Sequence, residues 1–278
     1  MENNNDKSVL ATIEDKFEDV FPAEQKIASF ILDNPEKAVN ANVSELANFS
    51  DVSDATVIRF CKHLGYEGYY QLRINLSRDL GRKQIDDNSS ESDSVNSIFN
   101  QFSSKIKEIG EIISEDKMRK AVELITSANL VHLAAVGNTS PLVMYMGFRL
   151  ERLGIRCTYN SLPEYFLNHI NLAQKDDLLF VISQSGTSKH IVQAMELAKK
   201  KGLKTVAVTG HKYSPVSRLA DCLLLSSDED QPFDYYKTYS HLCEMSVVDA
   251  LLNLVTNKDK ILETDADKPE IILSESKL

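Results

Sequence analysis

One short segment in the C-terminal half of the chain carries four hydroxyl side chains around a glycine. Residues 180–190 read Phe-Val-Ile-Ser-Gln-Ser-Gly-Thr-Ser-Lys-His and lie between an apolar run and a helical pattern. At the start of a helix, unbonded N–H groups and the positive end of the dipole attract an anion. We therefore expect a phosphate group to bind here, through Ser183, Gln184, Ser185, Gly186, Thr187 and Ser188. A strand-to-helix turn rich in capping residues would have the same composition without binding a ligand.

A second turn with hydroxyl side chains lies earlier in the chain, at residues 134–140, and reads Ala-Ala-Val-Gly-Asn-Thr-Ser. Gly137 and Asn138 would let a ligand approach the backbone closely, while Thr139 and Ser140 offer hydroxyl groups to a sugar. If both turns follow strands of one parallel sheet, their loops converge on one crevice. The dinucleotide fingerprint G-x-G-x-x-G is absent, so the turn does not indicate a nucleotide.

The N-terminal half contains a different pattern, in which two short helices are separated by about three residues. Asn42 and Glu45 are spaced as a capping box for the first helix, and Ser53 is placed to cap the second. Gly65 is expected to end the second helix. That helix should bury the apolar residues Val57, Phe60 and Leu64. So short a connection forces a sharp crossing, which is typical of a helix-turn-helix.

The second helix of this pair would present a face suited to the major groove of DNA. Burial of its apolar residues leaves the opposite face outward, and this face comprises Asp54, Ala55, Ile58, Arg59 and Lys62. We expect Arg59 to read guanine. The phosphate contacts are expected from Ser53, Thr56 and Lys62. A helical hairpin that exposes an arginine without binding DNA would have the same spacing.

The distribution of charge permits DNA binding despite a net charge of -10. Residues 1–55 carry four lysines against twelve acidic residues, whereas residues 56–83 carry six basic residues against two acidic ones. Screening confines each charge to about 10 Å, so a phosphate backbone responds to the local potential. The basic residues of the second segment are Arg59, Lys62, Arg73, Arg78, Arg82 and Lys83. Chance clustering on a solvated helix would give the same count.

The elements that must position these residues fall into two domains. Residues 1–83 are helical in pattern and nearly free of glycine and proline, which predicts an all-α helix-turn-helix domain. Residues 84–94 are rich in Ser, Asp, Asn and Glu, which predicts a linker. Residues 95–257 then alternate helical patterns with apolar runs at 130–136, 178–182, 205–208 and 222–225. This alternation predicts an α/β domain with a parallel sheet flanked by helices, followed by a charged tail at 258–278.

The N-terminal motifs resemble those of the RpiR family of transcription regulators. The resemblance is carried by residues 21–35, by Ser-Glu-Leu-Ala at 44–47, by residues 53–60 and by Leu-Gly-Tyr-Glu-Gly-Tyr at 64–69. Asp51 departs from the family pattern, which usually has glycine in the turn. Aspartate tolerates the left-handed conformation, so we expect the turn to be kept. The resemblance implies a helix-turn-helix domain joined to a sugar-isomerase (SIS) domain.

The C-terminal motifs resemble the SIS domain over about residues 105–256. The element Ile-Ser-Gln-Ser-Gly at 182–186 is intact, and residues 205–221 are similar to the later strand and loop of that domain. The resemblance implies that both hydroxyl-rich turns bind a phosphosugar, here through Thr139, Ser140, Ser183, Ser185 and Ser188. Ala135 and Thr139 replace the usual glycine and serine of the first turn, and His190 replaces an acidic residue after the second. These departures keep an anion site and leave the identity of the sugar open.

Together these features predict a regulator of carbohydrate-metabolism genes that binds a double-stranded DNA operator as a homodimer or homotetramer. A sugar phosphate would change its operator affinity. The alternative is a phosphosugar isomerase or lyase with an accessory helical domain, for which Glu164 and His190 are candidate bases. Neither residue lies in a motif that marks it as catalytic, and we expect neither enzyme activity nor a cofactor.

The cysteines indicate where the protein works. Cys61, Cys157, Cys222 and Cys243 are scattered without a metal-ligand or disulfide spacing, so we expect no metal and a reducing, cytoplasmic environment. No run approaches the roughly 20 apolar residues that span a bilayer, so we expect no membrane partner.

Overall fold

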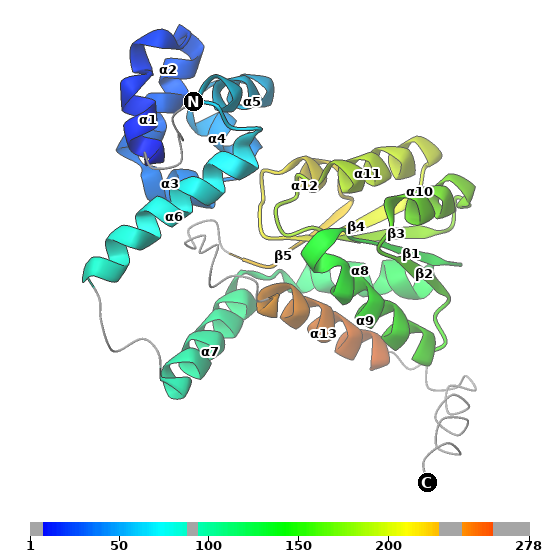
Figure 1. The fold of residues 1–278 in the computed structure, drawn as a ribbon. Coiled ribbons are helices and arrows are strands. Elements are labelled where there is room, and N and C mark those ends of the chain that lie inside the picture. The colour runs from blue at the N-terminus through cyan, green and yellow to red at the C-terminus, as the bar shows by residue number, and fades with distance from the viewer. Residues whose placement is uncertain (1–7, 88–93, 228–240, 258–278) are drawn as a thin grey trace. The chain divides into compact units, whose positions relative to one another are not determined.

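A computed structural model describes residues 8–87, 94–227 and 241–257 of the chain (Figure 1). The described residues divide into two compact units, one ending at Gln101 and one starting at Phe102. Residues 84–87 of the expected linker continue a helix, while residues 88–93 and the expected tail at 258–278 lie outside the described residues. In the parts of the chain that the structure describes, every helix is too short or too polar to cross a membrane.

The N-terminal unit packs short helices around one apolar core (Figure 1). Its elements are α1 (Val9–Asp15), a 3-10 turn (Phe17–Asp19), α2 (Pro22–Asp33), α3 (Pro35–Asn40), α4 (Val43–Phe49), α5 (Asp54–His63) and α6 (Tyr69–Asp87). Apolar side chains three and four residues apart line one face of each helix and meet in this core. The largest of them that are fully buried include Ile27, Ile31, Leu46, Phe60 and Leu72.

The helices α4 and α5 begin and end where the sequence predicts. The Asn42 side chain accepts hydrogen bonds from two N–H groups of the first turn of α4, and Glu45 accepts one from the Asn42 N–H at 2.8 Å. Ser53 caps the first turn of α5 through its hydroxyl. Gly65 follows the end of α5 with a φ of 98°, a conformation that glycine adopts without strain. The predicted capping box, cap and stop signal are therefore confirmed.

The connection between α4 and α5 turns at Asp51, which has a φ of 51°. The Val52 N–H donates to the carbonyl of Ala47 at 2.9 Å, and the Asp51 N–H donates to the carbonyl of Asn48 at 3.2 Å. This pair of bonds closes the carboxyl end of α4 around a left-handed residue. The expectation that aspartate keeps the turn is confirmed.

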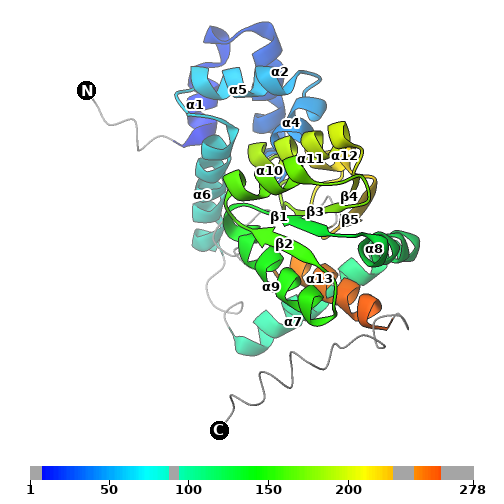
Figure 2. The same ribbon diagram turned by 90° about the vertical axis from the view of Figure 1, so that its right-hand side faces the viewer.

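The C-terminal unit is built on a five-stranded, wholly parallel sheet with the order β2-β1-β3-β4-β5 (Figure 2). The strands are β1 (Val131–Ala134), β2 (Cys157–Asn160), β3 (Leu178–Ile182), β4 (Lys204–Thr209) and β5 (Cys222–Leu225). Four of them coincide with the predicted apolar runs. The edge strand β2 was not predicted, because its residues are only half-buried and include Thr158 and Asn160, which interrupt any apolar run.

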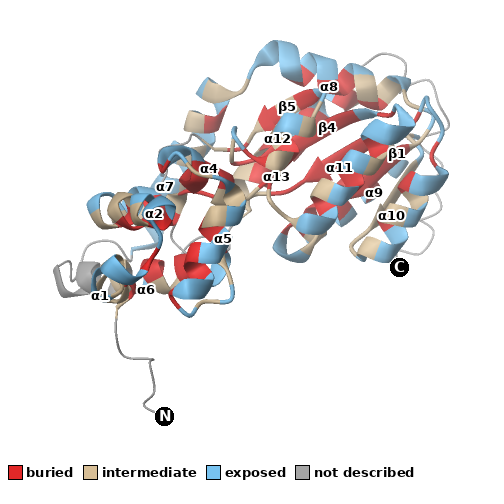
Figure 3. Cartoon of the chain, turned by 90° about the horizontal axis from the view of Figure 1, so that it is seen from above, coloured by how far each residue is buried: buried red, intermediate tan, exposed pale blue. Residues whose placement is uncertain are grey.

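Helices cover both faces of this sheet, as the α/β prediction requires (Figures 2 and 3). One face packs against α8 (Glu115–Ser127), α9 (Ser140–Arg152) and α13 (Leu242–Thr256), together with Ile109 from α7 (Val95–Ile112). The other packs against α10 (Pro163–Leu172), α11 (Lys189–Lys201) and α12 (Pro215–Leu219). Leu179 and Val181 face one layer while Phe180 faces the other, so the central strands are apolar on both sides.

Candidate functional site

The outward face of α5 carries most of the residues expected to contact DNA. Ser53, Ala55, Ile58, Arg59 and Lys62 are exposed, because Val57 and Phe60 of the same helix are fully buried. A short helix with an exposed arginine and lysine one turn apart is thus presented by the buried core beneath it.

Two of the expected contact residues are half-buried rather than exposed. Asp54 is half-buried, and its carboxylate accepts a hydrogen bond from the Ser44 hydroxyl at 2.6 Å, which ties the start of α5 to α4. Thr56 is also half-buried, and its hydroxyl lies 2.9 Å from the hydroxyl of Ser53. The expectation that Asp54 faces outward is therefore wrong, since a hydroxyl partner on the neighbouring helix draws its side chain in.

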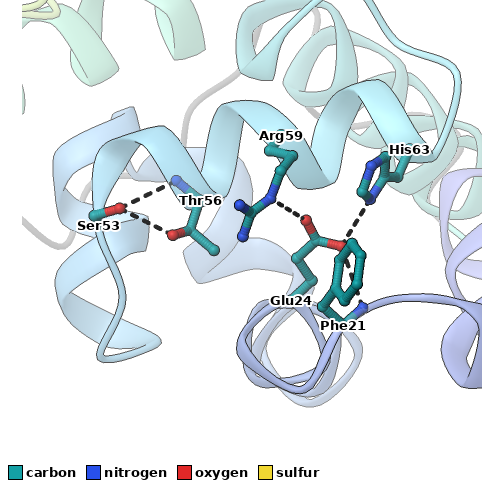
Figure 4. A network of polar contacts seen from close by, with 6 residues as sticks. All are labelled: Phe21, Glu24, Ser53, Thr56, Arg59 and His63. Atoms are coloured by element: carbon teal, nitrogen blue, oxygen red, sulfur yellow. Dashed lines mark hydrogen bonds and ion pairs between the residues drawn. The ribbon is translucent and has the colours of Figure 1, made fainter.

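Arg59 is held by a buried carboxylate that was not among the expected site residues (Figure 4). Glu24, in the first turn of α2, has no exposed surface; its Oε1 accepts a hydrogen bond from Arg59 Nε at 2.8 Å. Its Oε2 lies 2.8 Å from His63 Nδ1 and accepts a longer bond, 3.4 Å, from the Phe21 N–H. In the sequence, Glu24 is marked only by its position three residues after Phe21, at the start of a helix that opens with proline. That position does not indicate its partners, Arg59 and His63, because they lie far along the chain.

Glu24, Arg59 and His63 form a cluster, here called the Glu24 cluster, whose electrostatics keep Glu24 charged. Burial raises the pKa of the Glu24 carboxyl, whereas hydrogen bonds from Arg59 and His63 lower it. The lowering by the hydrogen bonds outweighs the effect of burial, so the pKa lies below its ordinary value of 4.5. Glu24 is therefore an anion at neutral pH, and the exposed arginine beside it has a fixed partner.

Arg73 is one of the six basic residues of segment 56–83, but it does not lie at the surface. It is buried on α6, and its guanidinium donates hydrogen bonds to the carbonyls of Val39 and Asn40 at the end of α3. A buried guanidinium needs such acceptors, and here they fix α6 against α3. On α5 the outward cations are Arg59 and Lys62.

In the C-terminal unit, the segment 183–188 leaves β3 and enters α11, as its sequence predicts. Its backbone is tied to the end of β4: the Ser183 N–H donates to the carbonyl of Val208, and the Gly210 N–H donates to that of Gln184. Gly186 has a φ of 63° and its carbonyl accepts from the Val216 N–H. Backbone hydrogen bonds thus hold the turn against the end of β4 and the start of α12.

Several polar groups of this turn remain available for a ligand. The Ser183 hydroxyl is buried and has no hydrogen-bond partner among the described residues. Ser188 begins α11 without a side-chain cap, so its hydroxyl and the first N–H groups of the helix are not joined to each other. The hydroxyls of Ser185 and Thr187 lie 3.1 Å apart. Gln184 is half-buried.

The structure brings the second hydroxyl-rich turn beside the first. β1 and β3 are neighbouring parallel strands, so the turns that follow them lie at the same edge of the sheet. The buried Thr139 hydroxyl shares its one O–H between two carbonyls, that of Val136 at 3.1 Å and that of Ile182 at 3.2 Å. Thr139 thus joins the two turns. Gly137, with a φ of 62°, and Asn138 are exposed, and Ser140 is half-buried at the start of α9.

A buried carboxylate at the end of β5 was not expected from the sequence. Glu244, in the first turn of α13, is buried; its Oε1 accepts a hydrogen bond from the Ser226 hydroxyl at 2.9 Å. Its Oε2 is 3.6 Å from His241 Nδ1, too far for a hydrogen bond. The sequence indicates its burial only through its spacing: Glu244 lies four residues before Val248 and therefore on the apolar face of α13.

Known proteins resemble the chain over nearly its whole length. The helix-turn-helix domain of the rpiR family matches residues 7–83, and the SIS domain matches residues 124–254. An uncharacterized HTH-type transcriptional regulator of Caldanaerobacter subterraneus is 30% identical over 257 residues, which cover 90% of this chain and 91% of the relative. The transcriptional regulator RpiR of Escherichia coli K12 is 24% identical over 233 residues, 82% of this chain and 79% of the relative.

A solved structure shares the fold of the chain. NanR of Vibrio vulnificus, complexed with ManNAc-6P, matches with a TM-score of 0.84 and 22% identity, over 98% of this chain and 100% of that one. Sequence and fold agree with the helix-turn-helix and the two-faced parallel sheet described above. The chain belongs to the rpiR family of helix-turn-helix transcriptional regulators and carries a C-terminal SIS domain.

Proposed function

We propose that this regulator binds operator DNA through the outward face of α5 and that a sugar phosphate, bound at the two hydroxyl-rich turns, changes its operator affinity. The observation that carries the ligand assignment is the hydrogen bonding of Thr139 to Ile182, which joins the two turns. It sets the uncapped start of α11 and the buried Ser183 hydroxyl beside a second polar turn. The relative NanR, complexed with ManNAc-6P, supports a phosphorylated sugar as the ligand class.

In this proposal the phosphate binds at the start of α11. The N–H groups of its first turn supply donors and the positive end of the dipole, and Ser183, Ser185, Thr187 and Ser188 supply hydroxyl groups. The sugar then extends toward Gly137, Asn138 and Ser140, where exposed backbone and a hydroxyl are available. The regulated genes serve carbohydrate metabolism, and two or four copies of the chain read an operator with matching symmetry.

On the DNA side, Arg59 reads guanine and Lys62 contacts phosphate, while Ser53 and Thr56 add hydroxyl contacts. Ala55 and Ile58 give the same face the small and apolar surface that approaches a thymine methyl group. Asp54 acts indirectly, because its bond to Ser44 sets the start of α5 against α4.

We further propose that the chain has no isomerase activity. The relatives named above are transcriptional regulators. The two candidate bases, Glu164 and His190, are both exposed in the first turns of their helices.

The test is a titration of fluorescently labelled double-stranded DNA, taken from the region upstream of the coding sequence, with the full chain. Fluorescence anisotropy is measured with and without a panel of phosphosugars, each paired with its unphosphorylated sugar. We expect saturable binding that one phosphosugar shifts and its unphosphorylated partner does not. Equal binding to scrambled DNA at every salt concentration would overturn the DNA assignment. Specific binding that no phosphosugar shifts would overturn the ligand assignment alone.

A further inference from the structure

The Arg59 side chain is restrained on one edge and open on the other. Its Nε donates to Glu24, and its guanidinium carbon lies 5.7 Å from the centre of the Phe21 ring. The two terminal nitrogens lie on the side of the guanidinium away from Glu24 (Figure 4). No residue in the described parts of the chain forms a hydrogen bond with those terminal nitrogens. About half of the side chain, 53%, is exposed.

This leaves the donors that guanine requires. A guanidinium has five N–H donors, and one of them, on Nε, is used by Glu24. The remaining four are on the terminal nitrogens, and a bidentate contact to guanine O6 and N7 needs two of them. The orientation that Glu24 imposes is therefore compatible with base reading rather than in competition with it.

We propose that Glu24 is a positioning residue for operator recognition, whose buried carboxylate orients Arg59 so that its terminal nitrogens meet a guanine in the major groove. This rests on the role proposed above for Arg59. Glu24 itself is wholly buried and does not reach the DNA, so its effect on recognition passes through Arg59.

The carboxylate is itself held in place. Its second oxygen is fixed by His63, one helical turn after Arg59, and by the N–H of Phe21. Both ends of the carboxylate therefore have partners, and it cannot rotate without losing a bond. An arginine fixed in this way loses little further rotamer freedom when it meets a base, whereas a free arginine would lose much more.

Electrostatics separate this role from a general contribution to DNA affinity. A carboxylate close to the DNA-facing surface repels phosphates, so on charge alone its removal should strengthen non-specific binding. A positioning role requires the opposite effect on the specific site. Replacement of Glu24 by glutamine should therefore weaken binding to the selected operator while binding to scrambled DNA is unchanged or stronger.

A matched control lies on the neighbouring helix. Glu45 occupies the same third position of α4 that Glu24 occupies in α2; it is also buried and bonds to the N–H that precedes its helix. Glu45→Gln thus removes a buried capping-box carboxylate without touching Arg59. Glu24→Asp is a second variant, which keeps the charge but shortens the side chain, and it covers the case in which Glu24→Gln is poorly folded.

The experiment selects binding sites from a random double-stranded DNA library with the full chain, in wild-type and variant form, and then measures affinities by fluorescence anisotropy. Arg59→Ala should lower affinity for the selected site by about 10- to 100-fold and abolish one guanine preference. Glu24→Gln should lower the affinity for the selected site by about 3- to 10-fold, and Glu24→Asp should lower it by less. Both variants should show a weaker preference for the guanine that Arg59 reads. In the Arg59→Ala background, Glu24→Gln should have less than about a twofold effect. Thermal unfolding confirms that each variant is folded.

Three outcomes would overturn the inference. An equal loss from Glu24→Gln with and without Arg59 would mean that Glu24 acts through the fold alone. A matching loss of base preference in Glu45→Gln would mean that any buried cap carboxylate has this effect. If Arg59→Ala leaves every guanine preference intact, the role proposed for Arg59 fails as well, whereas the first two outcomes leave that role standing.

Discussion

Gly186 lies against Ser214 so closely that a Cβ atom added to Gly186 would stand 2.0 Å from the Ser214 hydroxyl oxygen. The same Cβ would be 3.1 Å from the hydroxyl oxygen of Thr209. Gly186 also has a φ of 63°, which strains any residue with a Cβ. The turn after β3 therefore needs glycine for two independent reasons, space and backbone conformation.

Gly186→Ala should destabilise the C-terminal unit by at least about 2 kcal/mol, because both the strain and the contact with Ser214 must be relieved. Since the turn must move, we also expect the phosphosugar response to be lost. Gly137→Ala is the matched control: Gly137 has a similar φ of 62° but open space around it, so only about 1 kcal/mol should be lost. Urea unfolding followed by circular dichroism measures the loss of stability in each of the two variants. Equal losses would show that the Ser214 contact is unimportant.

The Ser183 hydroxyl offers a test that separates stability from ligand binding. It is buried without a partner, so Ser183→Ala should leave the free energy of unfolding unchanged or raise it by up to about 1 kcal/mol. If the hydroxyl binds the phosphate, effector affinity should fall by about 10-fold or more, as expected for a hydrogen bond to a charged group. Isothermal titration calorimetry with the phosphosugar that shifts DNA binding measures this loss.

Ser226→Ala is the contrasting variant. It removes the hydrogen bond to the buried Glu244 carboxylate and should cost about 1–2 kcal/mol of stability. A destabilised Ser183→Ala protein with unchanged effector affinity would contradict the role assigned to Ser183.

The Glu24 cluster should make the N-terminal unit sensitive to acid. The pKa of Glu24 is below 4.5 in the folded chain. The carboxylate therefore stabilises the fold fully at pH values above the pKa that Glu24 has in the unfolded chain. This contribution is lost as the pH falls through the pKa that Glu24 has in the folded chain. The difference in stability between wild type and Glu24→Gln should therefore be constant near neutral pH and shrink below about pH 4.5. Arg59→Ala should weaken the same dependence, because it removes a donor that lowers this pKa.

Urea unfolding at a series of pH values from neutral to about 3 tests this expectation. A wild-type advantage over Glu24→Gln that persists unchanged at the acid end would show that the carboxylate is not the titrating group.

The turn at Asp51 should accept glycine but not a β-branched residue. Its φ of 51° lies in the left-handed region, where aspartate is tolerated and valine is not. Asp51→Gly should leave Tm within a few degrees of wild type, whereas Asp51→Val should lower the Tm of the N-terminal unit by on the order of 5 °C. Lys26→Ala serves as the control, because the Lys26–Asp51 ion pair is exposed and contributes little. A large effect of Lys26→Ala would assign the turn's stability to the ion pair instead.

The amino-acid sequence by itself determines the elements and their ends. The capping box at Asn42, the cap at Ser53 and the stop at Gly65 act over three or four residues, so their outcome is set by neighbours along the chain. Strand β3 coincides with a predicted apolar run for a similar reason, since a strand buried on both faces must be apolar throughout. The motifs on these elements also identify the family.

Only the tertiary structure decides what each polar side chain bonds to. Arg59 meets Glu24 across 35 residues of sequence, and Thr139 meets Ile182 across 43. Arg73 looked like a surface cation but is buried, because the carbonyls at the end of α3 lie where its guanidinium can reach them. Such pairs depend on how helices pack, and a buried polar group takes whichever partner that packing supplies. No local pattern in the sequence specifies that partner.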